Sequence, residues 1–119
     1  MFKAVVETDK YGKNQKHYYL TQGDSATIYS KPYKNGELVD ISLVDNCVFK
    51  LSDSDYKQEF SKVLELDSVN GRFVLNLTSE ETTNFLVDQH FYEIQYTLIG
   101  GEVQTSNSWK FDIVDQIVE

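Results

Sequence analysis

The sequence of 119 residues predicts an all-β fold, and three observations support this prediction. Apolar residues alternate with polar ones over several short segments, as expected of strands that bury one face and expose the other. Asn-Gly and Gly-Gly pairs, which favour chain reversals, stand between these segments. Eight Tyr and seven Phe residues suit the half-buried surface of a sheet. The regular spacing of about eight such segments is typical of a β-sandwich or barrel.

The N-terminal half has a less regular pattern. We expect four strands there, over Phe2–Thr8, His17–Thr21, Ser25–Lys31 and Leu43–Ser52. The pair Asn35-Gly36, shortly after Pro32, predicts a reversal between the last two strands. The polar and charged segment Ser52–Ser61 is the best candidate for a long exposed loop, and loops carry function more often than strands do.

The C-terminal half alternates clearly. We expect strands over Val63–Val69, Arg72–Thr78, Tyr92–Ile99, Glu102–Thr105 and Trp109–Ile113. Asn70-Gly71 favours a tight primed hairpin turn, because both residues tolerate positive φ, and Gly100-Gly101 favours a second hairpin. The predicted core residues are Phe49, Leu51, Leu66, Phe73, Leu75, Leu77, Tyr92, Ile94, Tyr96, Trp109 and Phe111.

A short helical turn is expected over Ser79–Leu86. Thr78 and Glu81 have the spacing of a capping box, in which each side chain satisfies a backbone donor that the helix leaves without a partner. Phe85 and Leu86 would then close one end of the sandwich. We find no linker, internal repeat or low-complexity tract, so residues 1–119 are expected to form a single domain.

The charge balance argues against several partners. The formal net charge is −8 and the pI about 4.6, so the chain repels nucleic acid and anionic membrane surfaces. Lys10, Lys13 and Lys16 could contact an anion locally, but three spaced lysines are more typical of a solvated hairpin loop. The single cysteine, Cys47, lies in an apolar run and is expected to be a small buried hydrophobe.

The sequence contains no apolar run long enough for a membrane span or for the core of a signal peptide. We therefore expect a protein that stays on the cytoplasmic side unless another machine carries it out.

A hydrolase is one alternative, because Gly23-Asp24-Ser25 and Asp88-Gln89-His90 contain the residue types of a catalytic triad. The alternating strand-helix pattern of such hydrolases is absent, however, and Gly23-Asp24 is better interpreted as a turn before a strand. A zinc site on His17 and His90 lacks further ligands at zinc spacing. The sequence thus predicts that the protein is not an enzyme and holds no cofactor or metal.

A calcium site is a second alternative, suggested by Asp53, Asp55 and Glu59. Calcium prefers such oxygen ligands, but an EF-hand loop would continue with a further ligand and a glycine. Lys57 and Gln58 stand at those positions, so a solvated acidic loop is the better interpretation.

Four tyrosines are the candidate interface residues. Tyr18, Tyr19, Tyr29 and Tyr33 give the N-terminal half an aromatic-rich zone. Tyrosine suits protein interfaces because it offers a large rigid face with a hydroxyl, and it also stacks on sugars. Alternate members could instead fill the core and pair across strands. The pattern leaves a protein interface, a sugar platform and a purely structural role open.

Three sequence blocks resemble a known family. The first block is Thr21-Gln22-Gly23-Asp24-Ser25 followed by Lys34–Ile41, and the second is Phe73–Thr82. The third begins with Tyr92–Tyr96, continues through Gly101 and Val103–Thr105, and ends with Phe111–Ile113. Their order resembles the immunoglobulin-like N-terminal domain of phage baseplate upper proteins and related phage virion modules. The resemblance spans residues 17–114 and implies an immunoglobulin-like antiparallel β-sandwich of about seven to nine strands with one short helical turn.

The resemblance also implies a function. It predicts a phage or prophage virion structural protein, a tail, baseplate, neck or head-decoration subunit that docks on other virion proteins or on copies of itself. Such a protein is found in the virion, and in the host cytoplasm during assembly. The alternative from a different class is a carbohydrate- or ligand-binding β-sandwich, motivated by the tyrosine zone and the Ser52–Ser61 segment.

Overall fold

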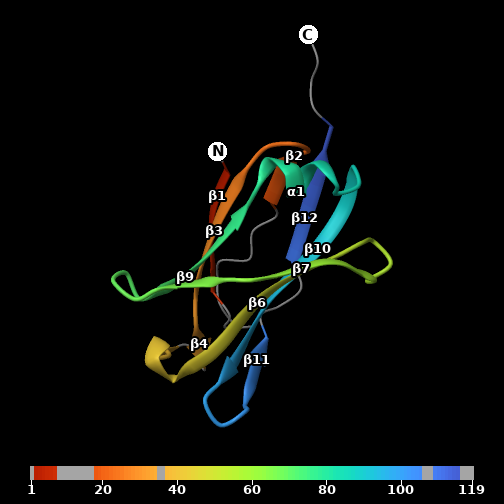
Figure 1. Cartoon of the computed structure of the whole chain (residues 1–119). Helices are drawn as coiled ribbons and strands as arrows, with labels where there is room; N and C mark the ends of the chain where they lie inside the picture. The colour runs from red at the N-terminus through yellow and green to blue at the C-terminus, as the bar shows by residue number, and fades with distance from the viewer. Residues whose placement is uncertain (1, 8–17, 35–36, 106–108, 116–119) are drawn as a thin grey trace.

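The computed structural model describes residues 2–7, 18–34, 37–105 and 109–115, and for residues 2–7, 33–34 and 109 it describes the backbone alone. It confirms the predicted β-sandwich. Two sheets pack on each other around a shared core, and a short helix, α1 (Ser79–Thr83), lies at one end (Figure 1). No described helix has the length and apolar character needed to cross a membrane.

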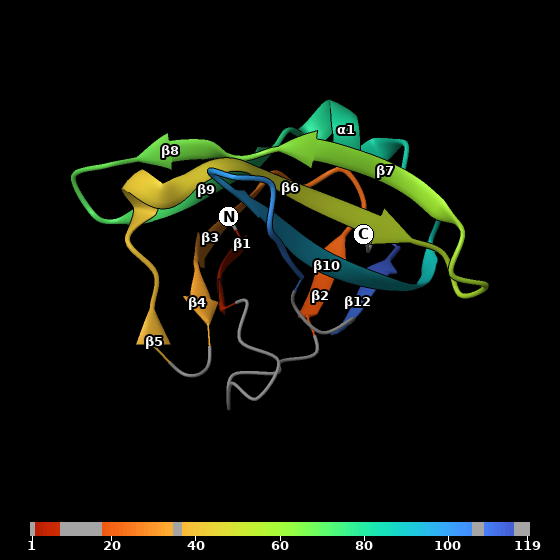
Figure 2. The ribbon, with the colours of Figure 1, turned by 90° about the horizontal axis from the view of Figure 1, so that it is seen from below.

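The first sheet has four strands in the spatial order β1 (Phe2–Glu7), β3 (Ala26–Lys31), β9 (Arg72–Leu77) and β8 (Glu65–Asp67). The second has six, and five of them follow the order β2 (Tyr18–Thr21), β12 (Trp109–Val114), β10 (Asp88–Leu98), β6 (Val44–Ser52) and β7 (Gln58–Val63) (Figure 2). The sixth, β11 (Val103–Thr105), pairs with the C-terminal half of β10 (Figure 1). A separate pair, β4 (Tyr33–Lys34) and β5 (Glu37–Leu38), precedes the 3-10 helix η1 (Ile41–Leu43). The described segments therefore contain more strands than the seven to nine predicted.

The predicted antiparallel arrangement holds except at the two N-terminal strands. β1 runs parallel to β3, and β2 runs parallel to β12. Hairpins force neighbouring strands to be antiparallel, but β2 pairs with a strand from the other end of the chain, so no turn constrains its direction. Each of these strands occupies one edge of its sheet.

The turn at Asn70-Gly71 is wider than predicted. Asp67 pairs with Arg72, so four residues lie between the strands, and among them Gly71 has a positive φ of 63°. The tight primed turn was therefore wrong, although the hairpin itself is confirmed. Gly100 and Gly101 both have positive φ and close the β10–β11 hairpin as expected. The pair Asn35-Gly36 lies outside the described residues, between the antiparallel strands β4 and β5.

The predicted long loop at Ser52–Ser61 is wrong, because the turn covers only residues 53–57 and β7 begins at Gln58. β7 is polar since it is an edge strand, where side chains have a neighbouring strand on one side only. The single strand predicted over Val63–Val69 is also wrong. The chain leaves the second sheet at Val63, passes the buried Leu64 and joins the first sheet as β8.

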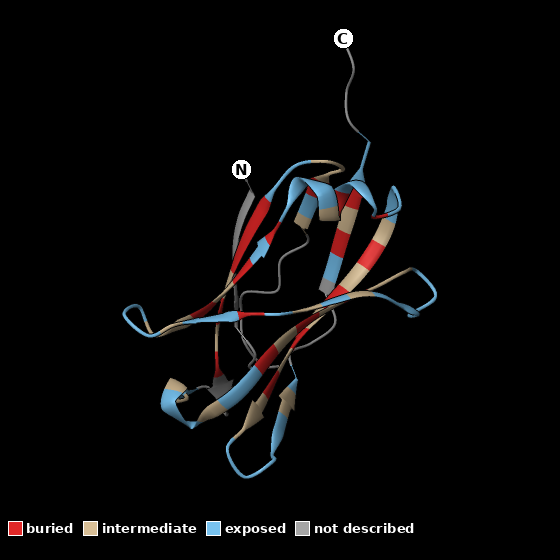
Figure 3. Cartoon of the chain, viewed as in Figure 1, coloured by how far each residue is buried: buried red, intermediate tan, exposed pale blue. Residues whose placement is uncertain are grey.

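The core forms between the two inner faces (Figure 3). Of the predicted core residues, the following are buried: Phe49, Leu51, Phe73, Leu75, Leu77, Tyr92, Ile94, Tyr96 and Phe111. Leu66 is 56% exposed and was wrongly assigned, because it lies on the edge strand β8. The backbone of Trp109 pairs with Tyr92, but its side chain lies outside the described part of the structure.

Two further groups complete the core. Ser30 of β3 and Tyr96 of β10 share a hydrogen bond between their hydroxyls, which joins the two sheets across the interior. Cys47 is 1% exposed, as predicted, and burial raises the pKa of its thiol to about 12. A thiol that is both buried and protonated is unreactive, so Cys47 serves packing.

Candidate interaction surface at the α1 end

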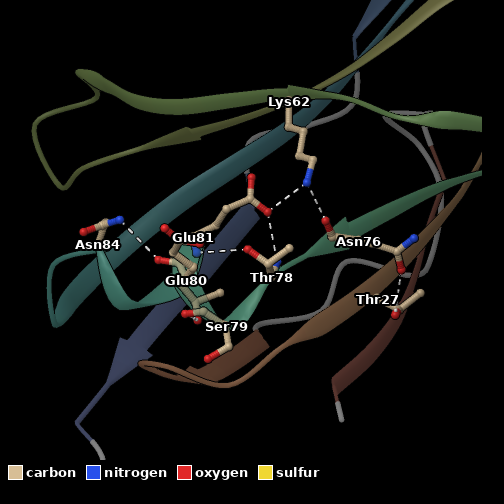
Figure 4. Close-up of polar contacts among 9 residues, drawn as sticks. Thr27, Lys62, Asn76, Thr78, Ser79, Glu80, Glu81 and Asn84 are labelled. Carbon is tan, nitrogen blue, oxygen red and sulfur yellow. Dashed lines mark hydrogen bonds and ion pairs between the residues drawn. The ribbon is translucent and has the colours of Figure 1, made fainter.

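The α1 helix begins as the sequence predicts. The Thr78 hydroxyl accepts a hydrogen bond from the Glu81 N–H at 3.1 Å, and the Glu81 carboxylate accepts one from the Thr78 N–H at 2.9 Å (Figure 4). Both halves of the capping box are present, which satisfies two donors at the start of a helix too short to be stable by itself. The helix is five residues long, shorter than the predicted Ser79–Leu86.

The helix is fastened to the turn between β2 and β3. The buried Thr82 hydroxyl donates to the Asp24 carbonyl at 2.8 Å and accepts from the Gly23 N–H at 3.2 Å. The Ser79 hydroxyl donates to the Gly23 carbonyl at 2.7 Å. Gly23 has a φ of 91°, a conformation that glycine adopts without strain. Two of the three sequence blocks that resemble phage modules are therefore joined by hydrogen bonds.

A further contact holds the end of α1. The Gln22 side-chain amide donates to the Phe85 carbonyl at 2.7 Å. Phe85 is buried, and its ring meets the ring of Phe60 edge-on with centroids 5.0 Å apart. The expected closure of one end of the sandwich is thus made by Phe85, whereas Leu86 points to solvent.

The helix also contacts the edge strand β7. Lys62 of β7 donates to the Glu81 carboxylate and to the Asn76 carbonyl, each at 2.8 Å (Figure 4). Burial alone would raise the pKa of Glu81, but hydrogen bonds from Lys62 and from the Thr78 N–H outweigh it and hold this pKa below its ordinary value. The ion pair therefore links the second sheet to the helix and to β9 of the first sheet.

This ion pair gives a pH-dependent prediction. Because the pKa of Glu81 is lowered in the folded state, its contribution to stability is present above the ordinary glutamate pKa of about 4.3 and is lost as the pH falls through the folded-state value. Glu81→Gln keeps a capping side chain but removes the charge, so at pH 7 we expect a loss of about 0.5–1 kcal/mol, shrinking below about pH 4.

The measurement is urea unfolding at pH 7 and at acidic pH. Glu80→Gln is the matched control, since it removes the same charge from the same helical turn outside the Lys62 ion pair. A loss that is equal for both variants, or independent of pH, would contradict the role given to the ion pair.

A bulge in β7 directs Glu59 towards the same end. The pairing shifts between Leu51 opposite Phe60 and Ser52 opposite Gln58, which leaves Glu59 as an extra residue. Its carboxylate accepts from the Leu86 N–H at 3.2 Å and lies 2.6 Å from Nε2 of the buried His90. His90 Nδ1 lies 3.0 Å from the Asp88 carbonyl, so both ring nitrogens have a hydrogen-bond partner.

The result is a rigid loop with an apolar tip. Leu86 is 65% and Val87 46% exposed, while the backbone around them is held by Glu59, Thr82 and Gln22. Exposed acidic residues lie on the neighbouring elements: Asp24, Glu80 and Asp88. Leu86 and Val87 thus form an exposed apolar pair beside acidic side chains at this end of the sandwich.

The structure separates the four candidate tyrosines. Tyr18 faces the core, with its ring 5.9 Å from that of Tyr92, whereas the next residue, Tyr19, is 59% exposed. Tyr29 lies in the other sheet, where the guanidinium of Arg72 covers its ring at 3.8 Å. The backbone of Tyr33 lies in β4, but its side chain is outside the described part. Tyr18, Tyr19 and Tyr29 therefore do not form a single surface.

The catalytic and metal alternatives are not assembled either. Both ring nitrogens of His90 are engaged by Asp88 and Glu59, so neither is left for Ser25. The Asp53 carboxylate accepts from the N–H groups of Asp55 and Lys57 and organises the turn. Among the described residues no group of three or more His, Cys, Asp or Glu side chains is placed to hold a metal ion. His17, Lys10, Lys13 and Lys16 lie outside the described residues.

Sequence reasoning missed one exposed aromatic residue. Tyr56, in the turn between β6 and β7, is 66% exposed and stacks on Phe91. The sequence signal was available, since an aromatic residue within a polar loop is conspicuous, but its stacking partner lies on a distant strand.

Comparison with solved structures places this fold among known domains. The N-terminal domain of phage TP901-1 ORF48 is similar with a TM-score of 0.64 and 16% sequence identity, over 98% of this chain and 100% of that one. The crystal structure of CopC from Methylosinus trichosporium OB3b is similar with a TM-score of 0.54 and 8% identity, over 87% and 88% of the two chains. The fold is shared with a phage protein domain. No protein-family model and no curated protein matches the sequence.

Proposed function

We propose that this protein is a structural module of a phage or prophage virion and works by docking rather than by catalysis. The observation that carries the proposal is the similarity to the phage ORF48 N-terminal domain, which extends over almost the whole of both chains. The similarity in fold agrees with the three sequence blocks that resemble virion modules, although folds are shared between functions. A tail, baseplate, neck or head-decoration position would suit such a module.

The α1 end is the proposed docking surface. Its loop is fixed before binding, so little conformational entropy is lost when a partner covers Leu86 and Val87. The acidic side chains of Asp24, Glu80 and Asp88 would favour a partner whose apolar pocket is flanked by basic groups. The proposed partners are other virion structural proteins or further copies of this chain, and the proposed location is the virion, with the host cytoplasm during assembly.

The experiment is quantitative mass spectrometry of particles purified from the organism or phage that encodes this chain. We expect the chain to be present in a fixed ratio to the other virion proteins and to remain after a high-salt wash. Particles that lack the chain, or that hold it in traces removed by washing, would overturn the proposal.

A further inference from the structure

The second sheet has an outer face that carries two exposed tyrosines. Tyr19 lies on this face, because its neighbours Tyr18 and Leu20 pack towards the core on the opposite side of β2. Phe91 lies on the same face, since it alternates with the buried residues His90 and Tyr92 of β10. Tyr56 stacks on Phe91 and so covers part of this face.

Tyr56 is held in position by its turn. Its φ of 60° is the left-handed conformation, which side chains other than Gly, Asn and Asp rarely adopt. The turn is closed by hydrogen bonds from the Tyr56 N–H to the Asp53 carbonyl at 3.0 Å and from the Asp53 N–H to the Lys57 carbonyl at 2.9 Å. The Asp53 carboxylate adds bonds to two further N–H groups. The ring is thus presented by an ordered turn rather than by a loose loop.

The two aromatic positions have a fixed spacing. The ring of Tyr56 lies 4.7 Å from that of Phe91 and nearly parallel to it, at 17°, so one ring face is covered and the other points outward. Tyr19 of β2 pairs with Asp112 of β12, which in turn pairs with Gln89 of β10. Phe91 lies two residues beyond Gln89 on the same strand. From strand spacing and rise, the Cα atoms of Tyr19 and Phe91 are about 12 Å apart.

The residues between the tyrosines are polar. Asp112 stands between Tyr19 and Gln89 in the sheet, and the exposed Lys110 pairs with Phe91. The centre of a protein interface is depleted in charged residues, whereas this strip has charged and amide groups between two aromatic rings. A sheet surface of this composition suits a ligand that has apolar faces and many hydroxyl groups.

We propose that this face binds a neutral oligosaccharide of pyranose units. The C–H groups of a pyranose face are slightly positive and pack on the electron-rich faces of Tyr19 and Tyr56. Lys110 and Gln89 lie on the same face between the two rings, where they can donate to and accept from sugar hydroxyls. This site is on a different surface from the α1 end and goes beyond the proposed structural role.

The test is a glycan array of neutral oligosaccharides probed with the whole chain, followed by calorimetric titration of the strongest hit. We expect binding, with losses of about tenfold or more for Tyr56→Ala and for Tyr19→Ala, since each loses one stacking contact. Tyr56→Phe keeps a ring and is expected to bind like the parent chain. Val69→Ala, at an exposed turn between β8 and β9, is the matched surface control.

Circular dichroism of each variant separates a lost contact from a lost fold. An array without hits, or binding that neither tyrosine variant weakens, would overturn the proposal. So would a protein partner, rather than a sugar, whose binding Tyr56→Ala abolishes. None of these results bears on whether the chain is present in virions, so the two proposals fail independently.

Discussion

Replacing Phe49 by alanine is expected to reduce the free energy of unfolding by about 3–5 kcal/mol, the largest effect of any substitution considered. Phe49 is fully buried in β6, and its ring lies 6.0 Å from that of Tyr92, 6.4 Å from Phe111 and 6.5 Å from Phe60. Alanine would remove the ring at the centre of this aromatic cluster and leave a cavity that surrounding strands fill only in part. Urea unfolding measures the loss.

The size of this effect is comparable with the whole stability of many domains, so the alanine variant is at risk of not folding. Phe49→Leu is therefore the second variant, with a smaller expected loss because most of the side-chain volume remains. Val69→Ala, at a position that is 91% exposed, is expected to change stability by less than about 0.5 kcal/mol. A loss below about 1 kcal/mol for Phe49→Ala would contradict the claim that Phe49 lies at the centre of the core.

The second large effect is expected at Thr82. Thr82→Val keeps the shape of the side chain but removes the hydroxyl that bonds the Gly23 N–H and the Asp24 carbonyl. These two groups would then lack their partner in a partly buried site, at a cost of about 2–3 kcal/mol. Urea unfolding at neutral pH is the measurement.

Thr83→Val is a matched control on the same helix. Its hydroxyl bonds only within the helix, to the Ser79 carbonyl at 2.7 Å, and its side chain is exposed. Solvent can replace that bond, so a change within about 0.5 kcal/mol is expected. Similar losses for the two variants would show that the bonds between α1 and the β2–β3 turn do not stabilise the fold.

The strands that the sequence predicted well are those with one face in the core and the other in water. Phe73, Leu75 and Leu77 of β9 are buried and alternate with Arg72, Val74 and Asn76, which are less buried because the sheet is covered on one side. The capping box at Thr78 was equally predictable, since both of its partners lie within one helical turn.

The edges of the sheets were harder to predict. β7 is a polar edge strand, so its composition is that of a loop, and Leu66 on β8 is apolar although no burial requires it. The parallel pairings of β1 and β2 depend on contacts between distant parts of the chain, which alternation along one strand does not encode.

The candidate surfaces also depend on contacts between residues that are distant in the sequence. Gly23 and Thr82 were both in recognisable blocks, but the hydrogen bond between them joins residues 59 positions apart. Tyr18 and Tyr19 were both predicted as interface residues, but as neighbours on one strand they point to opposite sides of the sheet. Tyr18 therefore packs against the core and Tyr19 is exposed. The role of Tyr56 depends on Phe91, a partner that only the folded sheet brings near.

The docking role of the α1 end is tested most directly by measuring incorporation of two variants into particles. Leu86→Asp places a charge on the exposed tip of the α1 end, and Val69→Asp places the same charge on the β8–β9 hairpin, which projects away from α1 (Figure 1). Because both positions are exposed, both variants are expected to fold. We expect Leu86→Asp to be lost from purified particles and Val69→Asp to be retained at the parental ratio. Equal incorporation of both variants would contradict this docking role.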